Sequence, residues 1–187
     1  MNQTRAALLQ EAEYLIRKRG YAAFSYSDLS AKIGITKASI HHHFPTKEAL
    51  GSALIDDYLE RCECELETLS KGPGDATAKL LAYGDFFAQG IKEGLLPLCG
   101  VLASDVSALP EALRSRVEQF FQHHLDWLEN EIRAGAESGE LTIAMSPKRA
   151  ARVVLSTLQG ASLVAWALGE TASVKPTLKD LLQQLRK

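Results

Sequence analysis

The stretch SIHHHFPTKEAL, from Ser39 to Leu50, decides the fold of this chain. It ends one short helix at Pro45, because proline lacks the N–H group that a helix interior needs. Thr46 then offers a side-chain oxygen that caps the start of another helix. Apolar residues continue at helical spacing to Leu66, and the break Gly72-Pro73-Gly74 ends that helix. The stretch therefore predicts a short helix followed at once by a long one.

Two more helices are predicted upstream. The first runs from Thr4 to Arg19 and closes with three basic residues, which suit the negative end of a helix. Ser25 and Asp28 form a capping box for a second helix that ends at Gly34, and a third helix runs from Lys37 to Phe44. Two short helices around a glycine turn are typical of a helix-turn-helix, whose second helix enters the major groove of DNA.

The rest of the 187-residue chain carries helical patterns only. Helices are predicted over residues 75–93, 100–107, 110–137, 147–170 and 174–186, and no segment alternates as a strand does. The predicted fold class is therefore all-α. We expect a three-helix helix-turn-helix head in residues 1–50, followed by a second, helical domain in residues 51–187.

Charge differs between these two regions. Residues 1–50 contain seven Lys/Arg and four Asp/Glu, a net charge of +3, whereas residues 51–187 contain 14 and 19, a net charge of −5. A basic head attracts a polyanion, and an acidic body repels it. The distribution favours double-stranded DNA as a partner of the head.

The three cysteines, Cys62, Cys64 and Cys99, match no zinc-ligand spacing and are odd in number, which indicates a reducing compartment without a disulfide framework. No signal peptide is recognisable, and the longest uncharged run, Val153 to Gly169, is short for a membrane span and contains four polar residues. We therefore expect a cytoplasmic protein without a membrane partner. Adjacent histidines on a helix point about 100° apart, so we expect no metal at His41, His42 and His43. We also expect no cofactor.

The head resembles that of the tetracycline-repressor family of transcriptional regulators. The likeness rests on Gly20-Tyr21, Ser25, Asp28-Leu29, Ile33-Gly34-Ile35-Thr36-Lys37 and His42-His43-Phe44-Pro45-Thr46-Lys47-Glu48-Ala49-Leu50. It implies that the operator is contacted by Tyr26, Thr36, Lys37, Ser39, His41, His42 and Lys47. In this set Lys47 contacts one phosphate and Tyr26 another. The resemblance also implies that residues 51–187 form a helical ligand-binding and dimerisation domain. His41 stands where this family usually has tyrosine, so the operator sequence and its pH dependence are expected to differ from those of relatives.

Large aromatic residues gather between residues 83 and 127. Such side chains either line a cavity for a small, partly apolar ligand or fill a core. The resemblance implies an effector among the middle helices, and the candidate contacts are Phe86, Phe87, Cys99, Phe120, Phe121, His124 and Trp127. Cys99 follows Pro97 at a helix start, where orphan N–H groups favour a thiolate, so it is either an electrophile or oxidant sensor or a small packing residue.

The helix predicted from Pro147 onward has small residues at four-residue intervals, which let a second helix approach closely. Pairing this helix and the last one with their copies gives a four-helix, two-fold interface, as the resemblance also implies. The candidate interface residues are Val154, Leu158, Ala161, Ala165 and Leu168. Burial inside one subunit is the alternative.

These features together predict a homodimeric, ligand-responsive transcriptional regulator. As a repressor, it binds an inverted-repeat operator and leaves it when a small-molecule effector occupies the body. An enzyme is not predicted. The alternatives are an architectural DNA binder that needs no effector, and a thiol enzyme that uses Cys99 with His123 or His124; no oxyanion element or orienting acid accompanies these residues at a recognisable spacing.

Overall fold

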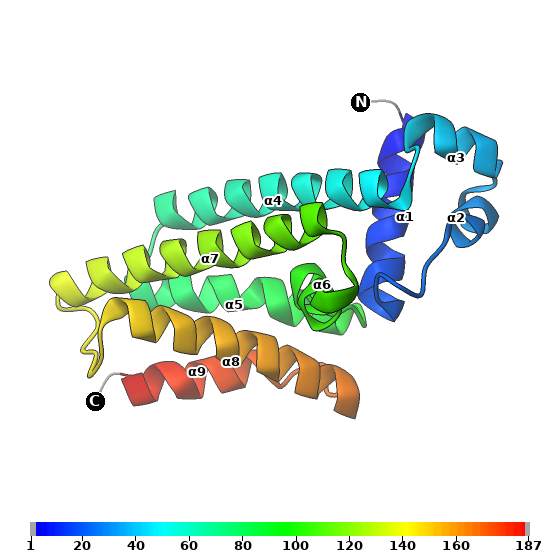
Figure 1. The fold of residues 1–187 in the computed structure, drawn as a ribbon. Helices are drawn as coiled ribbons and strands as arrows, with labels where there is room; N and C mark the ends of the chain where they lie inside the picture. The colour runs from blue at the N-terminus through cyan, green and yellow to red at the C-terminus, as the bar shows by residue number, and fades with distance from the viewer. Residues whose placement is uncertain (1–2, 186–187) are drawn as a thin grey trace. The chain divides into compact units, whose positions relative to one another are not determined.

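The computed structural model describes residues 3–185, which form nine α-helices and no strand (Figure 1). The helices are α1 (Gln3–Arg19), α2 (Tyr26–Ile33), α3 (Lys37–His43), α4 (Lys47–Lys71), α5 (Ala76–Lys92), α6 (Leu98–Ser104), α7 (Glu111–Glu137), α8 (Pro147–Leu168) and α9 (Val174–Leu185), with a 3-10 turn at Val106–Ala108. The all-α prediction is confirmed. The predicted boundaries agree to within two residues, except that the helix expected over 100–107 covers Leu98–Ser104; Arg186, the expected last residue, lies outside the described range.

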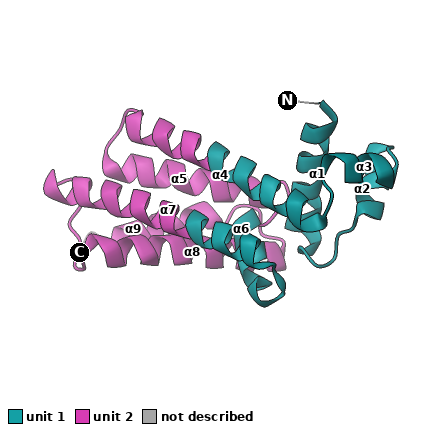
Figure 2. Cartoon of the chain, turned by 45° about the horizontal axis from the view of Figure 1, so that its top comes forward, with its two compact units in different colours: residues 1–61, 98–120 teal, residues 62–97, 121–187 magenta. Residues whose placement is uncertain are grey.

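The chain divides into two compact units (Figure 2). Unit 1 consists of residues 1–61 and 98–120, and unit 2 of residues 62–97 and 121–187. This division differs from the predicted one at residue 50, because α6 packs against α1 and the first part of α7 joins the same unit. Helices α4 and α7 each contribute residues to both units.

Local capping explains the short helices of the head. The Ser25 N–H and hydroxyl both donate to the Asp28 carboxylate, at 2.8 and 2.6 Å, and fix the start of α2. Gly34 ends this helix with a φ of 77°, a left-handed conformation that glycine adopts without strain. The Thr36 hydroxyl then accepts the Ser39 N–H at 3.1 Å and begins α3.

Unit 1 has an apolar core that joins the head to α6 and the start of α7. Its buried residues include Leu8, Leu15, Ile16, Phe24, Leu29, Ile40, Phe44, Leu50, Leu54, Leu98, Leu102 and Leu113. A Cβ atom at Gly51 would lie 2.8 Å from Leu113 Cδ2 and 3.1 Å from the Tyr21 ring. Glycine at this position therefore lets α4 approach α7 and the α1–α2 turn closely.

Unit 2 is built around the packing of α5, α8 and α9. Its core includes Leu80, Tyr83, Phe87, Leu128, Ile132, Val154, Leu158, Ala165, Leu178 and Leu182. Gly84 of α5 faces Leu178 of α9 so closely that any side chain there would clash. Within residues 3–185, α8 is the one helix that is long and apolar enough to cross a membrane. A helix that packs in the core of a soluble protein can have the same length and composition, and α8 packs against α5 and α9.

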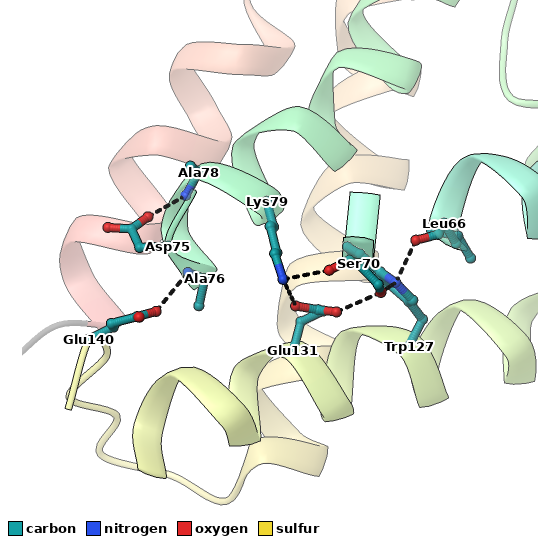
Figure 3. A network of polar contacts seen from close by, with 9 residues as sticks. All are labelled: Leu66, Ser70, Asp75, Ala76, Ala78, Lys79, Trp127, Glu131 and Glu140. Carbon is teal, nitrogen blue, oxygen red and sulfur yellow. Dashed lines mark hydrogen bonds and ion pairs between the residues drawn. The ribbon is translucent and has the colours of Figure 1, made fainter. Parts of the chain in front are cut away.

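A polar network within unit 2 fastens the end of α4 to α5 and α7 (Figure 3). The Trp127 indole N–H donates to the Leu66 carbonyl at 3.1 Å and to the Ser70 hydroxyl at 2.8 Å. Ser70 in turn donates to Glu131, and Lys79 bridges the Ser70 carbonyl and the Glu131 carboxylate at 2.9 and 3.4 Å. These bonds satisfy the partly buried charges of Lys79 and Glu131.

Candidate nucleic-acid interface and effector site

Helix α3 has one buried side and one exposed side. Ile40 and Phe44 are buried and hold the helix against the head. Lys37, His41 and His42 are exposed, and Ser39 is half-buried. The structure therefore brings four of the predicted DNA contacts together on one short helix, with Thr36 at its start. Their side chains offer the donors and acceptors that base edges and phosphates require.

His41 is held at the end of α3 by two contacts. Its Nδ1 atom lies 3.1 Å from the Pro45 carbonyl oxygen, and its ring lies 4.8 Å from the ring of Tyr26 in an edge arrangement. These contacts fix the orientation of an exposed imidazole. The sequence pointed to His41 but not to its contact with Tyr26, because that contact depends on how α2 packs against α3.

Tyr26 has a structural role that the sequence did not reveal. Its hydroxyl donates to the Phe44 carbonyl at 2.8 Å, which links α2 to the residue that ends α3. Burial raises the pKa of Tyr26 to about 12, with a smaller contribution from Tyr21, so the hydroxyl keeps its proton over the physiological range. The donor that we expected on a phosphate is thus engaged inside the head.

Lys47 lies among contacts that the sequence did not reveal. Its ammonium lies 4.6 Å from the ring centre of Tyr21 and 4.4 Å from that of Phe24, and it donates to the Ala22 carbonyl at 3.5 Å. Burial lowers the Lys47 pKa, and the charge of Asp28 partly opposes this. The aromatic faces of Tyr21 and Phe24 and the charge of Asp28 both stabilise the cation at this helix start. The phosphate contact of Lys47 stays a prediction.

The aromatic residues of unit 2 surround Tyr83, a residue that the sequence did not single out as a ligand contact. Its ring lies 5.2 Å from Trp127, 5.4 Å from Phe87 and 6.3 Å from Phe86, measured between ring centres. Phe121 packs against the same core. Tyr83 and Phe87 are buried, whereas Phe86 is 38% exposed. We call Tyr83, Phe86, Phe87, His124 and Trp127 the ring cluster.

His124 supplies a polar group of the ring cluster. The Tyr83 hydroxyl and His124 Nδ1 are 2.7 Å apart and hydrogen-bonded. Burial, helped by the neighbouring His123, lowers the pKa of His124 to about 3, so the imidazole is neutral near pH 7. Such a weakly basic ring is a poor general base near pH 7.

The other candidate effector contacts are distributed differently from our expectation. Cys99 and Phe120 belong to unit 1, where both are buried and the Phe120 ring lies 5.8 Å from that of Tyr58. Cys99 is 0% exposed near the start of α6, an environment typical of a packing cysteine. Trp127 belongs to the ring cluster but directs its N–H into the network of Figure 3, so its polar group serves the fold.

Most of the five residues predicted for the dimer interface lie on the buried side of α8. Val154, Leu158 and Ala165 are 0% exposed and belong to the core of their own subunit, because this side of α8 packs on α5 and α9. Ala161 packs partly against the same core. Of the five residues, Leu168 alone is exposed, at 66%.

The outer side of α8 is apolar instead. It carries Leu163 and Val164, which are 57% and 55% exposed, and Gly160, where an added Cβ atom would meet open space. With Ala167 and Leu168 these residues recur at positions 160, 163, 164, 167 and 168, the spacing of one helix face. We call these five residues the outer α8 face.

A pocket in unit 1 was not predicted. It has a volume of about 270 Å³ and is lined by Ala6, Leu9, Gln10, Glu13, Leu54, Asp57 and Arg61. Arg61 is paired with both carboxylates that line it, at 2.5 Å from Glu13 and 3.1 Å from Asp57. Among residues 3–185, no group of three or more potential ligands is arranged to hold a metal ion.

Comparisons with known proteins extend the likeness to the whole chain. Residues 8–54 match the family model of bacterial regulatory proteins of the tetR family. The crystal structure of a TetR-family transcriptional regulator from Agrobacterium tumefaciens is 32% identical, covers 98% of each chain and superposes with a TM-score of 0.94. The transcriptional repressor NemR of Escherichia coli K12 is 29% identical over 88% of this chain and 84% of its own length. The crystal structure of its reduced form gives a TM-score of 0.82, at 26% identity over 98% of this chain and 96% of that one.

Proposed function

Since the chain belongs to the TetR family of bacterial transcriptional regulators, we propose that it is a dimeric repressor that a small-molecule effector releases from an inverted-repeat operator. The observation that carries this proposal is the exposed polar side of α3 above the buried Ile40 and Phe44. Regulators of this family bind operators and effectors, typically as dimers. A protein that binds the chromosome acts in the cytoplasm.

The operator contact is supported by the chemistry of α3. Lys37 and His42 are exposed and suit phosphates and base edges, and Ser39 lies within one turn of each. A helix of seven residues reaches few bases, so phosphate contacts must supply much of the affinity. A dimer places two heads on one duplex and so doubles the number of base and phosphate contacts.

The outer α8 face supports the dimer. Leu163, Val164 and Leu168 expose large apolar side chains next to the small Gly160, so a second copy of α8 can approach closely and remove them from water. A two-fold axis through this face makes the interface self-complementary. A two-fold dimer that binds successive major grooves needs its two α3 helices about 34–36 Å apart, and its symmetry is why we propose an inverted repeat.

The ring cluster supports an effector site in unit 2. Its aromatic faces, the Tyr83 hydroxyl and the neutral His124 suit a small, uncharged and partly apolar molecule. Phe86 is the exposed member, and we propose that the effector enters beside it. Because Tyr83 and Phe87 are buried, an effector must repack the rings of α5 and α7. A ligand that favours the repacked state shifts the population away from the DNA-binding state.

Selection from random-sequence duplexes with the full chain tests the operator proposal. We expect an enriched inverted repeat, and a Lys37→Ala variant that binds it at least tenfold more weakly at the same salt concentration. A chain that selects no duplex would contradict the proposal. Thermal shift with apolar, cationic and electrophilic compounds then tests the effector, since a ligand of the native state raises the melting temperature. Comparison with Cys99→Ser shows whether the thiol takes part.

A further inference from the structure

The contact between His41 and Pro45 determines which ring nitrogen of His41 carries a proton. A backbone carbonyl oxygen accepts hydrogen bonds and never donates them. At 3.1 Å from that oxygen, Nδ1 of His41 must therefore be the N–H donor. A neutral imidazole has a single N–H, so its Nε2 is left as an acceptor.

The surroundings of His41 favour this tautomer. The Pro45 carbonyl lies just beyond the end of α3, where proline at 45 stops the helix and turns the chain. The Tyr26 ring flanks the imidazole at 4.8 Å, and Tyr26 is itself held by its bond to Phe44. The imidazole is thus positioned from two sides, while the residue remains exposed on the helix that carries Lys37 and His42.

We propose that His41 is a specificity-determining residue that presents Nε2 as a hydrogen-bond acceptor to a base with an exocyclic amino group. In the major groove these bases are cytosine, through N4, and adenine, through N6. Guanine and thymine present O6, N7 or O4 acceptors, which cannot pair with a second acceptor. The inference rests on the proposed function, because it requires α3 to lie in the major groove.

The tautomer can be tested without DNA. The full chain with ¹⁵N-labelled histidine is measured by NMR at pH 8, where an imidazole is neutral, and the His41 signals are assigned by their loss in His41→Gln. We expect a protonated Nδ1 and an unprotonated Nε2 in His41. A protonated Nε2 and a bare Nδ1 would overturn the proposal.

The base preference is tested at the same pH with the operator found by selection. We expect cytosine or adenine at one position of each half-site. Replacing that base by 2-pyrimidinone or purine, which deletes only the amino group, should weaken binding roughly threefold to tenfold. The His41→Ala variant should lose this sensitivity, and His42→Ala should keep it.

The outcomes separate the two proposals. If the wild-type chain selects an operator but no position in it shows a His41-dependent requirement for an amino group, the role of His41 is wrong and the repressor assignment stands. If the chain selects no duplex at all, the repressor assignment fails and the role of His41 fails with it.

Discussion

The hydroxyl of Tyr26 and the carbonyl of Phe44, 18 residues apart in sequence, are joined by a hydrogen bond of 2.8 Å. This bond connects the first helix of the helix-turn-helix to the end of the second. It fixes the place where α3 gives way to the chain that leads into α4. The end of α3 is therefore tied to a side chain of α2.

Removing this hydroxyl should weaken the head and its DNA binding together. Tyr26→Phe keeps the ring against His41 but leaves the Phe44 carbonyl without this donor. We expect the free energy of unfolding to fall by about 0.5–1.5 kcal/mol in urea titrations, and operator affinity to fall as well. Tyr14→Phe, a change at an exposed tyrosine of α1, is the matched control. Unchanged stability and affinity in Tyr26→Phe would show that the bond contributes nothing.

Lys47 and Lys37 should respond differently to loss of charge. Lys47→Gln removes a cation from the faces of Tyr21 and Phe24, so unfolding should become easier by about 0.5–2 kcal/mol. Lys37→Gln should leave stability unchanged, because Lys37 is exposed, but should reduce the salt dependence of operator binding by about one unit of slope. Whether Lys47→Gln also reduces the slope decides its predicted phosphate contact. Urea unfolding and binding titrations over a range of salt concentrations measure both quantities.

Acid should destabilise unit 2 through His124. Its pKa is lowered from 6.5 to about 3 in the folded chain. Between these two pH values His124 is therefore protonated in the unfolded chain but neutral in the folded chain. The contribution of His124 to stability is complete above pH 6.5, and it is lost between pH 6.5 and pH 3 at up to about 1.4 kcal/mol per pH unit. His124→Gln should flatten this part of the stability profile. His123→Gln should leave most of it, because burial is the larger cause of the shift.

A charge on the outer α8 face should separate the subunits. Val164→Glu places a carboxylate where we propose that a second copy packs, and burial of an unpaired charge is strongly unfavourable. We expect a monomer in analytical ultracentrifugation at concentrations where the wild-type chain is dimeric. Asn130→Asp, at an exposed position of α7, should leave the dimer intact. A dimeric Val164→Glu protein would place the interface elsewhere.

The head was predictable because its signals are local. Ser25, Gly34, Thr36 and Pro45 each act within a few residues, and each stands where a helix of the structure begins or ends. Lys47 was harder, since the rings beneath it come from the α1–α2 turn, more than twenty residues earlier. Its helix-start position suggested an anion, and nothing in the sequence showed that aromatic faces would take that place.

The exposed apolar face of α8 was missed for a related reason. An apolar helix with several apolar sides does not reveal which side its own subunit buries. The small residues suggested a close approach of another helix, and Ala165 does lie on the side that meets α5 and α9, but those helices belong to the same chain. Knowing that Leu158 and Ala165 are core would have put Leu163, Val164 and Leu168 on the opposite side.

The contact of Gly51 with Leu113 and Tyr21 bears on the engineering of hybrid repressors. A head exchanged between relatives by cutting at residue 50 would leave behind α6 and the beginning of α7, which belong to its own compact unit. Tyr21 of the graft would then meet a foreign residue 51 and a foreign α7, because Gly51 and Leu113 lie beyond the cut. A hybrid that keeps this unit intact must take both residues 1–61 and residues 98–120 from the same parent. The exchanged part is therefore encoded by two separate segments of the gene.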